Sequence, residues 1–165
     1  MKRIISILME NESGALSRVV GLFSQRGYNI DTLTVAPTDD DTLSRLTLTT
    51  NGDDHMAEQI VKQLHKLIDT IKVIDLTEGP HIERELMLVK IKASDTDSRT
   101  ELKNCVEIFR GSIIDVTPAT YTVQLAGDSE KLDAFIEAVS QIGIMEVSRS
   151  GVTGISRGDK FIRVN

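Results

Sequence analysis

The sequence is poor in the residues that build disulfides, metal sites and aromatic cores. Its 165 residues include one cysteine, Cys105, and no tryptophan, and aromatic residues make up 4% of the chain. A single cysteine excludes an intrachain disulfide and a CxxC motif, and this is typical of proteins in a reducing compartment. Because aromatics are scarce while hydrophobic residues reach 40%, we expect a packed core of isoleucine, valine and leucine, as in sheets covered by helices.

Long apolar stretches and an excess of positive charge are also missing. The formal net charge is -6 and the sequence pI is about 5.1, which argues against a broad nucleic-acid interface. The apolar run at residues 4–9 is too short for the core of a signal peptide, and no run approaches the length that spans a bilayer. We therefore expect a cytoplasmic protein without nucleic-acid or membrane partners.

Known catalytic motifs are absent as well. The sequence contains no nucleophile elbow, HExxH motif, dinucleotide fingerprint or kinase-like set, and its histidines are scattered at His55, His65 and His81. The acidic run 39–41 could hold a hard cation, but three acids in a turn are more often simply solvated. Cys105 has no histidine nearby in the sequence and is interpreted as a core filler. We predict no catalytic residues and no metal site in this chain.

A polar loop, a helix and a strand follow one another in residues 11–35. Four apolar residues recur at the i, i+3, i+4, i+7 spacing of one helical face: Leu16, Val19, Val20 and Phe23. Ser13 is predicted to cap the start of this helix, and Gly27 to end it in the left-handed conformation. The stretch therefore predicts an amphipathic helix between a polar loop and a strand.

The loop before this helix is a candidate anion site. Backbone N–H groups at a helix start lie at the positive end of the helix dipole and could hold the carboxylate of an amino acid. Gly14 has no side chain to block a close approach, and Asn11 and Asn29 each offer a carboxamide. From this stretch alone, an ordinary helix start that binds no ligand is the commoner case, and both interpretations stay open.

Six elements are predicted before residue 77. Strands are expected at residues 4–9, 30–35, 43–50 and 71–76. On the first strand, Ile5, Ile7 and Met9 are expected to share one face. A second helix, with Asp54 as its N-cap, carries an apolar stripe formed by Met56, Ile60, Leu64, Leu67 and Ile68. The resulting order βαββαβ predicts a four-stranded antiparallel sheet with two helices on one face.

The same order repeats after the breaker cluster at residues 77–80. Strands are expected at residues 85–93, 112–117, 120–126 and 145–149, with a polar loop at residues 95–98. Arg26-Gly27 aligns with Arg110-Gly111 at an offset of 84 residues, which indicates a duplicated module in which Gly111 again ends a helix. Ile113 replaces Asn29, so the second module is not expected to bind a ligand in the same way.

The predicted fold class is α+β, with two ferredoxin-like βαββαβ modules whose antiparallel sheets carry helices on one face. The domains are placed at residues 1–77 and 81–165. The tail after Ser150 is rich in glycine and lacks the order of a phosphate-binding loop. It is expected to be flexible or to dock a partner.

Nine segments carry a recognisable pattern in a fixed order over nearly the full length. They are residues 11–35, 37–38, 44–45, 82–91, 108–111, 114–118, 121–127, 131–135 and 149–152. Together they resemble the small, regulatory subunits of acetolactate synthase (acetohydroxyacid synthase), and the first module resembles the ACT domain of that family. A single ACT-like motif would be weak evidence, whereas this set is specific.

The resemblance implies a regulatory subunit that is not an enzyme by itself. Such subunits bind and activate the large catalytic subunit and confer feedback inhibition by valine in branched-chain amino acid biosynthesis. Thiamine diphosphate, FAD and magnesium belong to the large subunit, so no cofactor is expected here. Valine is expected between the ACT domains of a homodimer. The family's site residues that match in this sequence are Asn11, Gly14, Ala15 and Leu16 of one chain and Asn29 and Ile30 of the other.

Two other functions are weighed against this one. An amino-acid-sensing ACT module could instead serve another enzyme or a transcription regulator, but a regulator would need a helix-turn-helix or a basic segment, and neither is present. A small metal-dependent enzyme could use the acidic turn at residues 39–41. That hypothesis requires activity of the isolated chain that changes on chelation.

Overall fold

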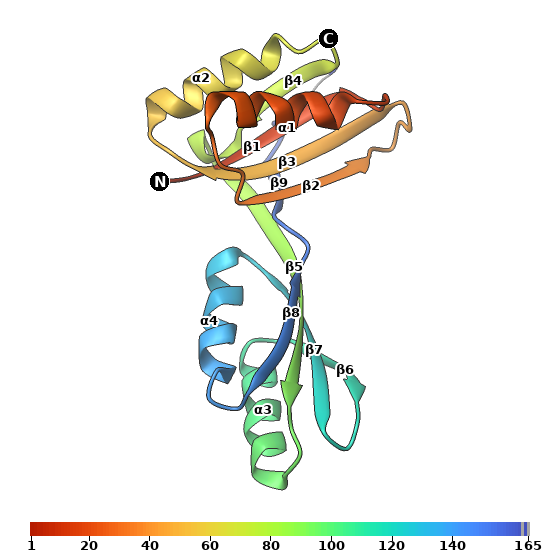
Figure 1. The fold of residues 1–165 in the computed structure, drawn as a ribbon, viewed down its shortest axis with the longest axis vertical. Helices are drawn as coiled ribbons and strands as arrows, with labels where there is room; N and C mark the ends of the chain where they lie inside the picture. The colour runs from red at the N-terminus through yellow and green to blue at the C-terminus, as the bar shows by residue number, and fades with distance from the viewer. Residues whose placement is uncertain (163, 165) are drawn as a thin grey trace. The chain divides into compact units, whose positions relative to one another are not determined.

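The computed structural model describes residues 1–162 and residue 164, and these form two compact units. The first unit contains residues 1–83 together with the chain from residue 151 onward, and the second contains residues 84–150. Figure 1 labels the elements of both units.

The first unit is built on a four-stranded antiparallel sheet. Its elements are β1 (Lys2–Glu10), α1 (Ala15–Arg26), β2 (Thr32–Pro37), β3 (Leu43–Asn51), α2 (Asp54–His65) and β4 (Thr70–Asp75), followed by the short 3-10 helix η1 (Leu76–Glu78). The strand order is β2-β3-β1-β4. Both helices cover the same face of this sheet (Figure 1), so the predicted βαββαβ module is confirmed.

The core of this unit lies between the sheet and its two helices. Ile5, Ile7 and Met9 point into it from β1, as predicted. Helix α1 contributes Val19 and Phe23 as expected, but its third buried residue is Ala15. The predicted stripe is therefore partly wrong: Leu16 and Val20 are 38% and 42% exposed, because the sheet contacts a helical face rotated toward Ala15.

Helix α2 differs from the prediction at both ends. Asp53, and not Asp54, is its N-cap, and its Oδ1 accepts a hydrogen bond from the Met56 N–H at 2.8 Å. At the other end, Ile68 was expected on the apolar stripe but is 86% exposed. The helix ends at His65, so Ile68 lies in the following turn and no longer follows the helical period.

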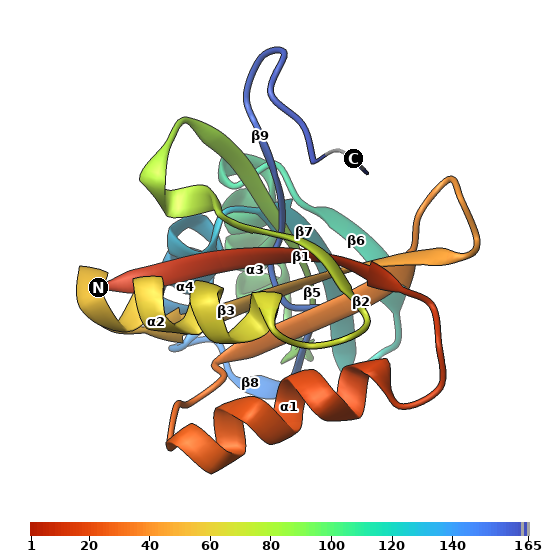
Figure 2. The ribbon, with the colours of Figure 1, turned by 90° about the horizontal axis from the view of Figure 1, so that it is seen from above.

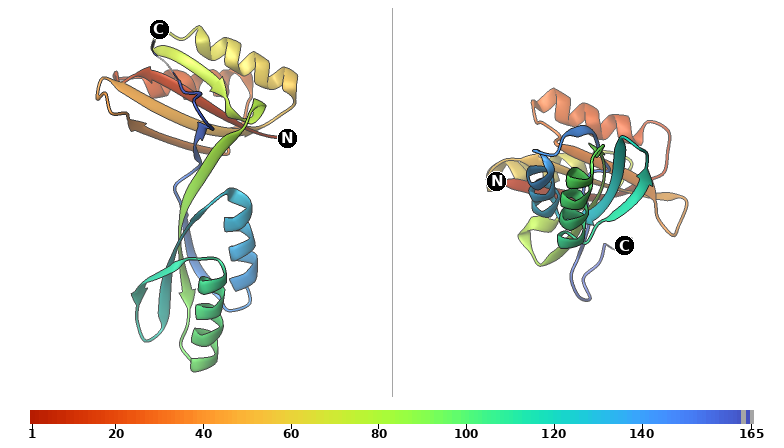
Figure 3. Two further views of the ribbon diagram at one scale, coloured as in Figure 1. Left: turned by 180° about the vertical axis from the view of Figure 1, so that it is seen from behind. Right: turned by 90° about the horizontal axis from the view of Figure 1, so that it is seen from below.

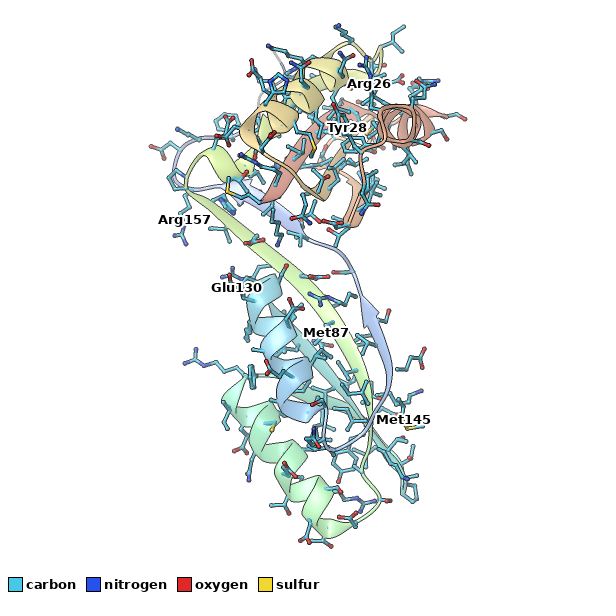
Figure 4. The ribbon with its side chains drawn as sticks, turned by 60° about the vertical axis from the view of Figure 1, so that its left-hand side comes forward. Arg26, Tyr28, Met87, Glu130, Met145 and Arg157 are labelled. Atoms are coloured by element: carbon cyan, nitrogen blue, oxygen red, sulfur yellow. The ribbon has the colours of Figure 1, made fainter. Side chains whose placement is uncertain are left out.

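The second unit repeats the architecture. Its elements are β5 (His81–Lys92, which begins in the first unit), α3 (Thr96–Ile108), β6 (Ser112–Val116), β7 (Thr120–Gly127), α4 (Ser129–Val139) and β8 (Ile144–Arg149). The strand order is β6-β7-β5-β8, and a core of mainly aliphatic residues lies between this sheet and its helices. In Figure 4, Met87 lies among the side chains of this core and Met145 lies at the edge strand β8. The predicted fold class, α+β with two ferredoxin-like modules, is confirmed.

Two local predictions in the second unit are wrong. Residues 95–98 do not form a polar loop, because α3 already begins at Thr96 with Asp95 as its N-cap. Gly111 was expected to end α3, but the helix already ends at Ile108 with Phe109 as its C-cap. The residue that follows in the left-handed region is Arg110, at φ 57°. Gly111 is needed for another reason, since a Cβ there would lie 3.1 Å from the Gln124 carbonyl oxygen.

The tail is ordered against the first unit. Its strand β9 (Thr153–Ser156) pairs with β5, and Arg45 Nη2 donates to the Gly154 carbonyl oxygen at 2.9 Å. Val152 packs with Ile4 and Leu76 in a small cluster on the face of the first sheet that carries no helix. Figures 2 and 3 show β9 passing over this sheet.

This arrangement differs from the expected flexible or partner-docking tail. A glycine-rich segment is typical of a loop, but backbone pairing with a distant strand can order it. The tail was also assigned to the second domain, whereas its described contacts are with the first unit. The domain boundaries at residues 1–77 and 81–165 otherwise stay a prediction, and residues 163 and 165 lie outside the described part of the chain.

Candidate ligand-binding site

Helix α1 starts without a side-chain cap. Its N-cap is Gly14 at φ 84°, and none of the side chains that the structure describes caps the first turn, so the predicted cap by Ser13 is wrong. Among the described residues, the N–H groups of Leu16 and Ser17 have no hydrogen-bond acceptor. These free donors lie at the positive end of the helix dipole, which is the arrangement that attracts a small anion.

The other three α-helices fill this position with a carboxylate of their own. Asp53 caps α2, Asp95 caps α3 and Asp128 caps α4. Each accepts a hydrogen bond from a first-turn N–H, at 2.8, 2.8 and 2.9 Å respectively. Of the four helices in the described chain, α1 is therefore the one whose first turn can accept an external carboxylate.

The loop before α1 is held by the turn between β2 and β3. The Asn11 N–H donates to the Thr42 carbonyl oxygen at 2.8 Å. Asn11 Nδ2 donates to the Asp41 carbonyl oxygen at 2.9 Å. The predicted site residue Asn11 thus uses its amide donor inside the chain, while its carboxamide oxygen makes no hydrogen bond to another described residue and stays available.

Arg18 lies beside the candidate site and was not predicted from the sequence. Its guanidinium lies beside Gly14, because a Cβ on Gly14 would sit 3.1 Å from Arg18 Nη1. Nε donates to Asp69 Oδ2 at 2.6 Å, and this hydrogen bond raises the pKa of Arg18 above its usual value. The signal in the sequence was the i+4 spacing from Gly14, which places a cation one turn above the loop.

Asn29 and Ile30 lie beyond the opposite end of α1. Gly27 ends the helix at φ 70°, as predicted. Asn29 Nδ2 donates to Asp31 Oδ1 at 2.9 Å, and the Asn29 carbonyl oxygen accepts from Thr50 Oγ1 at 2.6 Å. Ile30 is half-buried and packs against the core.

The predicted site residues fall into two groups within one chain. Asn11, Gly14, Ala15 and Leu16 gather at the start of α1, where Ala15 is buried and Leu16 is partly exposed. Asn29 and Ile30 follow its end. A helix of twelve residues is about 18 Å long, so one chain does not bring the two groups around a small ligand.

Other candidate chemistry is limited. Within residues 1–162 and 164, there is no group of three or more His, Cys, Asp or Glu side chains that could hold a metal ion. Cys105 is half-buried and packs against the second core. Every helix in that part of the chain is too short or too polar to cross a bilayer.

Comparison with known proteins assigns the chain to a family. Residues 84–158 match the family described as the small subunit of acetolactate synthase, and residues 5–72 match the ACT domain of AHAS small subunits. The acetolactate synthase isozyme 3 small subunit of Escherichia coli (strain K12) is 65% identical over 164 residues, which cover 99% of this chain and 100% of that protein. The chain belongs to the acetolactate synthase small-subunit family.

Further members of the family agree with this assignment. The acetolactate synthase small subunit of Haemophilus influenzae is 58% identical over 98% of this chain and 99% of its own length. The crystal structure of the small subunit from Thermotoga maritima matches with a TM-score of 0.86 at 35% identity, covering 97% of this chain and 99% of that one. Membership in the family makes the chain a regulatory subunit in branched-chain amino acid biosynthesis and implies a catalytic large-subunit partner.

Proposed function

We propose that this chain binds and activates the catalytic large subunit of acetolactate synthase and makes it sensitive to feedback inhibition by valine. In this proposal the chain has no catalytic residues. Thiamine diphosphate, FAD and magnesium are bound by the large subunit, and the complex works in the cytoplasm. The observation that carries the proposal is the uncapped start of α1, where the N–H groups of Leu16 and Ser17 are free to receive a carboxylate.

The residues around α1 match the chemistry of an amino acid with a short aliphatic side chain. The valine carboxylate binds the first-turn N–H groups, and the nearby guanidinium of Arg18 adds positive potential. The carboxamide oxygen of Asn29 accepts from the valine ammonium, since its Nδ2 already donates to Asp31. Leu16 and Ile30 supply apolar contacts for the isopropyl group.

This site requires two chains. The two groups of residues lie at opposite ends of α1, so the loop of one chain must meet Asn29 and Ile30 of another. Strand β2 is an edge strand of its sheet, and the exposed Leu16 and Val20 offer apolar surface on α1. A two-fold pairing would cover this edge and build two equivalent sites at once.

Inhibition then follows from linkage. Valine shifts an equilibrium between active and inhibited complexes only by the difference between its affinities for the two. Because half of each site comes from each chain, the spacing of the two ACT domains sets the valine affinity. A large subunit that favours one spacing therefore changes valine binding, and valine in turn changes the state of the large subunit.

The test is a titration of valine into the full chain by calorimetry, followed by reconstitution with the large subunit. Saturable binding is expected for the wild type. Asn29→His should abolish it, because an imidazole replaces the carboxamide whose oxygen accepts from the valine ammonium. Asn104→His is the matched control, since Asn104 is exposed on α3 in the second unit. In the reconstituted enzyme, Asn29→His should keep activation but lose valine inhibition. A complex that the wild-type chain neither activates nor makes sensitive to valine would contradict the proposal.

A further inference from the structure

A pocket lies on the side of the first unit opposite to α1. It has a volume of about 590 Å³ and opens on the helix-free face of the sheet, between β1, β2, β3 and the tail. Volumes of this order are typical of small-molecule sites. None of the residues proposed to bind valine lines it, so its ligand chemistry is independent of that site.

The pocket contains a cation, Arg45, that has no acidic partner among the residues that the structure describes. Arg45 lies on β3 and is half-buried. Its Nε donates to Ser6 Oγ at 2.8 Å and its Nη2 donates to the Gly154 carbonyl oxygen at 2.9 Å. Arg45 forms no ion pair with any residue that the structure describes, and burial lowers the pKa of its guanidinium. A half-buried guanidinium held by two neutral oxygens keeps donor capacity for an oxyanion.

Two hydroxyl groups and an apolar wall complete the lining. Thr34 and Thr47 are direct cross-strand partners on β2 and β3, and both line the pocket. Neither hydroxyl bonds to another residue in the described part of the chain, so both can donate to a ligand. The apolar side is supplied by Leu8, Ala36, Pro37, Leu43, Ile162 and Val164. The lining therefore suits a molecule with one anionic end and a short hydrocarbon part.

We propose that this pocket binds a small aliphatic monocarboxylate, with the carboxylate on Arg45 and the threonine hydroxyls and the hydrocarbon against the apolar wall. The rim selects against more highly charged anions. Asp39 and Asp40 lie at its edge, and two hydrogen bonds from Thr42 lower the pKa of Asp40 and keep it ionised. A phosphate dianion meets more repulsion there than a monocarboxylate does.

Strand β9 of the tail can report whether a ligand occupies this pocket. Thr153 lines the pocket next to Gly154, whose carbonyl oxygen accepts from Arg45. A carboxylate on Arg45 thus changes the surroundings of β9 without any contact with α1. Backbone amide resonances of Thr34, Thr47 and Thr153 are the appropriate reporters.

The experiment is a titration of the full chain, labelled with ¹⁵N, with isobutyrate and separately with inorganic phosphate. Isobutyrate should shift the reporter amides in a saturable way, and phosphate should not. Arg45→Gln should weaken isobutyrate binding at least about tenfold. Arg157→Gln should leave it unchanged, because Arg157 is exposed on the same tail and does not line the pocket.

Two further variants keep the outcome decisive. Ala36→Phe keeps the Arg45 guanidinium but fills the space beside it, since Ala36 is the cross-strand partner of Arg45. This variant should also abolish binding, so misfolding of Arg45→Gln alone would not hide the result. Asn29→His should bind isobutyrate like the wild type even when it no longer binds valine. The inference would be overturned by absent or unsaturable shifts, by tighter binding of phosphate, or by isobutyrate binding as tightly to both pocket variants as to the wild type.

Discussion

The first helices of the two units begin in opposite ways. Helix α1 starts at Gly14 with free N–H groups, whereas α3 starts with the carboxylate of Asp95 on the N–H of Ser98. An aspartate at this position places a tethered anion where a ligand carboxylate would bind. The residue at the helix start therefore decides whether the first-turn N–H groups are left open, as in α1, or are occupied by a carboxylate of the chain itself, as in α3.

Each unit also has an ion pair at an equivalent position between two strands, but the basic and the acidic residue have exchanged strands. Arg3 on β1 faces Asp75 on β4, with Nη1 and Oδ2 3.5 Å apart. In the second unit, Glu85 on β5 pairs with Arg149 on β8 at 2.9 Å. Arg3 and Glu85 each stand two residues before the strand partner of Asp75 and Arg149. The position is the same, but the pair in the first unit is more deeply buried.

The largest expected effect comes from breaking the buried pair of the first unit. Arg3→Met leaves Asp75 buried without a cation and should lower the free energy of unfolding by about 3–5 kcal/mol. Tyrosine fluorescence in a Tyr121→Phe background reports this, because Tyr28 is then the one tyrosine left. The double variant Arg3→Met/Asp75→Asn should recover part of the loss, since an amide oxygen still accepts from the Thr77 N–H.

The matched control for this pair is Arg149→Met. Arg149 is 32% exposed on its side chain while Arg3 is 4% exposed, so water partly solvates Glu85 once the arginine is gone. The cost should be about 2 kcal/mol. Equal losses for the two variants would show that burial does not decide the strength of these pairs.

Gly14→Asp makes the start of α1 resemble that of α3. The new carboxylate competes with the valine carboxylate, and the side chain is strained at φ 84°. We expect at least about 100-fold weaker valine binding by calorimetry, which is about 2.7 kcal/mol. Gly158→Asp is the control, because Gly158 also has a positive φ, of 69°, and has open space around it. Undiminished valine affinity in Gly14→Asp would remove the loop from the site.

Two variants at the C-terminal ends of helices should change the free energy of unfolding by smaller amounts and in opposite directions. Arg110→Gly should raise the free energy of unfolding of the second unit by up to about 1 kcal/mol, because it relieves a non-glycine residue at φ 57°. Gly27→Ala should lower that of the first unit by about 1 kcal/mol, since it introduces the same strain. Urea titrations of both variants measure these shifts, and shifts of the same sign would contradict the explanation.

The smallest expected effect is a pH dependence specific to α3. Hydrogen bonds from the backbone and side chain of Ser98 lower the pKa of Asp95 from 3.8. The cap therefore stabilises the folded state above the unfolded pKa, and this contribution is lost as pH falls through the lower folded pKa. Stability of the wild type should fall more steeply below about pH 4 than that of Asp95→Asn, whose amide caps without titrating. If the stability of both proteins fell equally with pH, Asp95 would not be the source of this pH dependence.

The regular elements could be predicted because their signals are local. Alternation on β1 and the breaker at Gly27 depend on neighbouring residues, and both predictions are confirmed. The buried face of α1 was harder, because Ala15 and Leu16 both fit an apolar stripe and the sheet decides which one is buried. Strand β9 could not be predicted, since four residues near glycines gain their order only from a distant partner.

The candidate site was predicted less completely than the fold. The sequence drew attention to Gly14 for its small size, while the structure adds its left-handed conformation and the guanidinium of Arg18 beside it. The proposed pairing of the loop with Asn29 rests on the family resemblance and not on a local pattern, because the proposal involves a second chain. Arg45 was missed because its significance depends on forming no ion pair with any described residue while facing a pocket, and sequence spacing does not reveal that.

The position of β9 has a consequence for the order of events on the ribosome. Residues 84–150 are contiguous, so the second unit can close as soon as they emerge. The first unit contains the start of the chain, yet Val152 is needed to cover Ile4 and Leu76. The main core of the first unit comes from residues 5–73 and does not include Val152. The cover over Ile4 and Leu76, in contrast, can form only after the intervening residues of the second unit have been made.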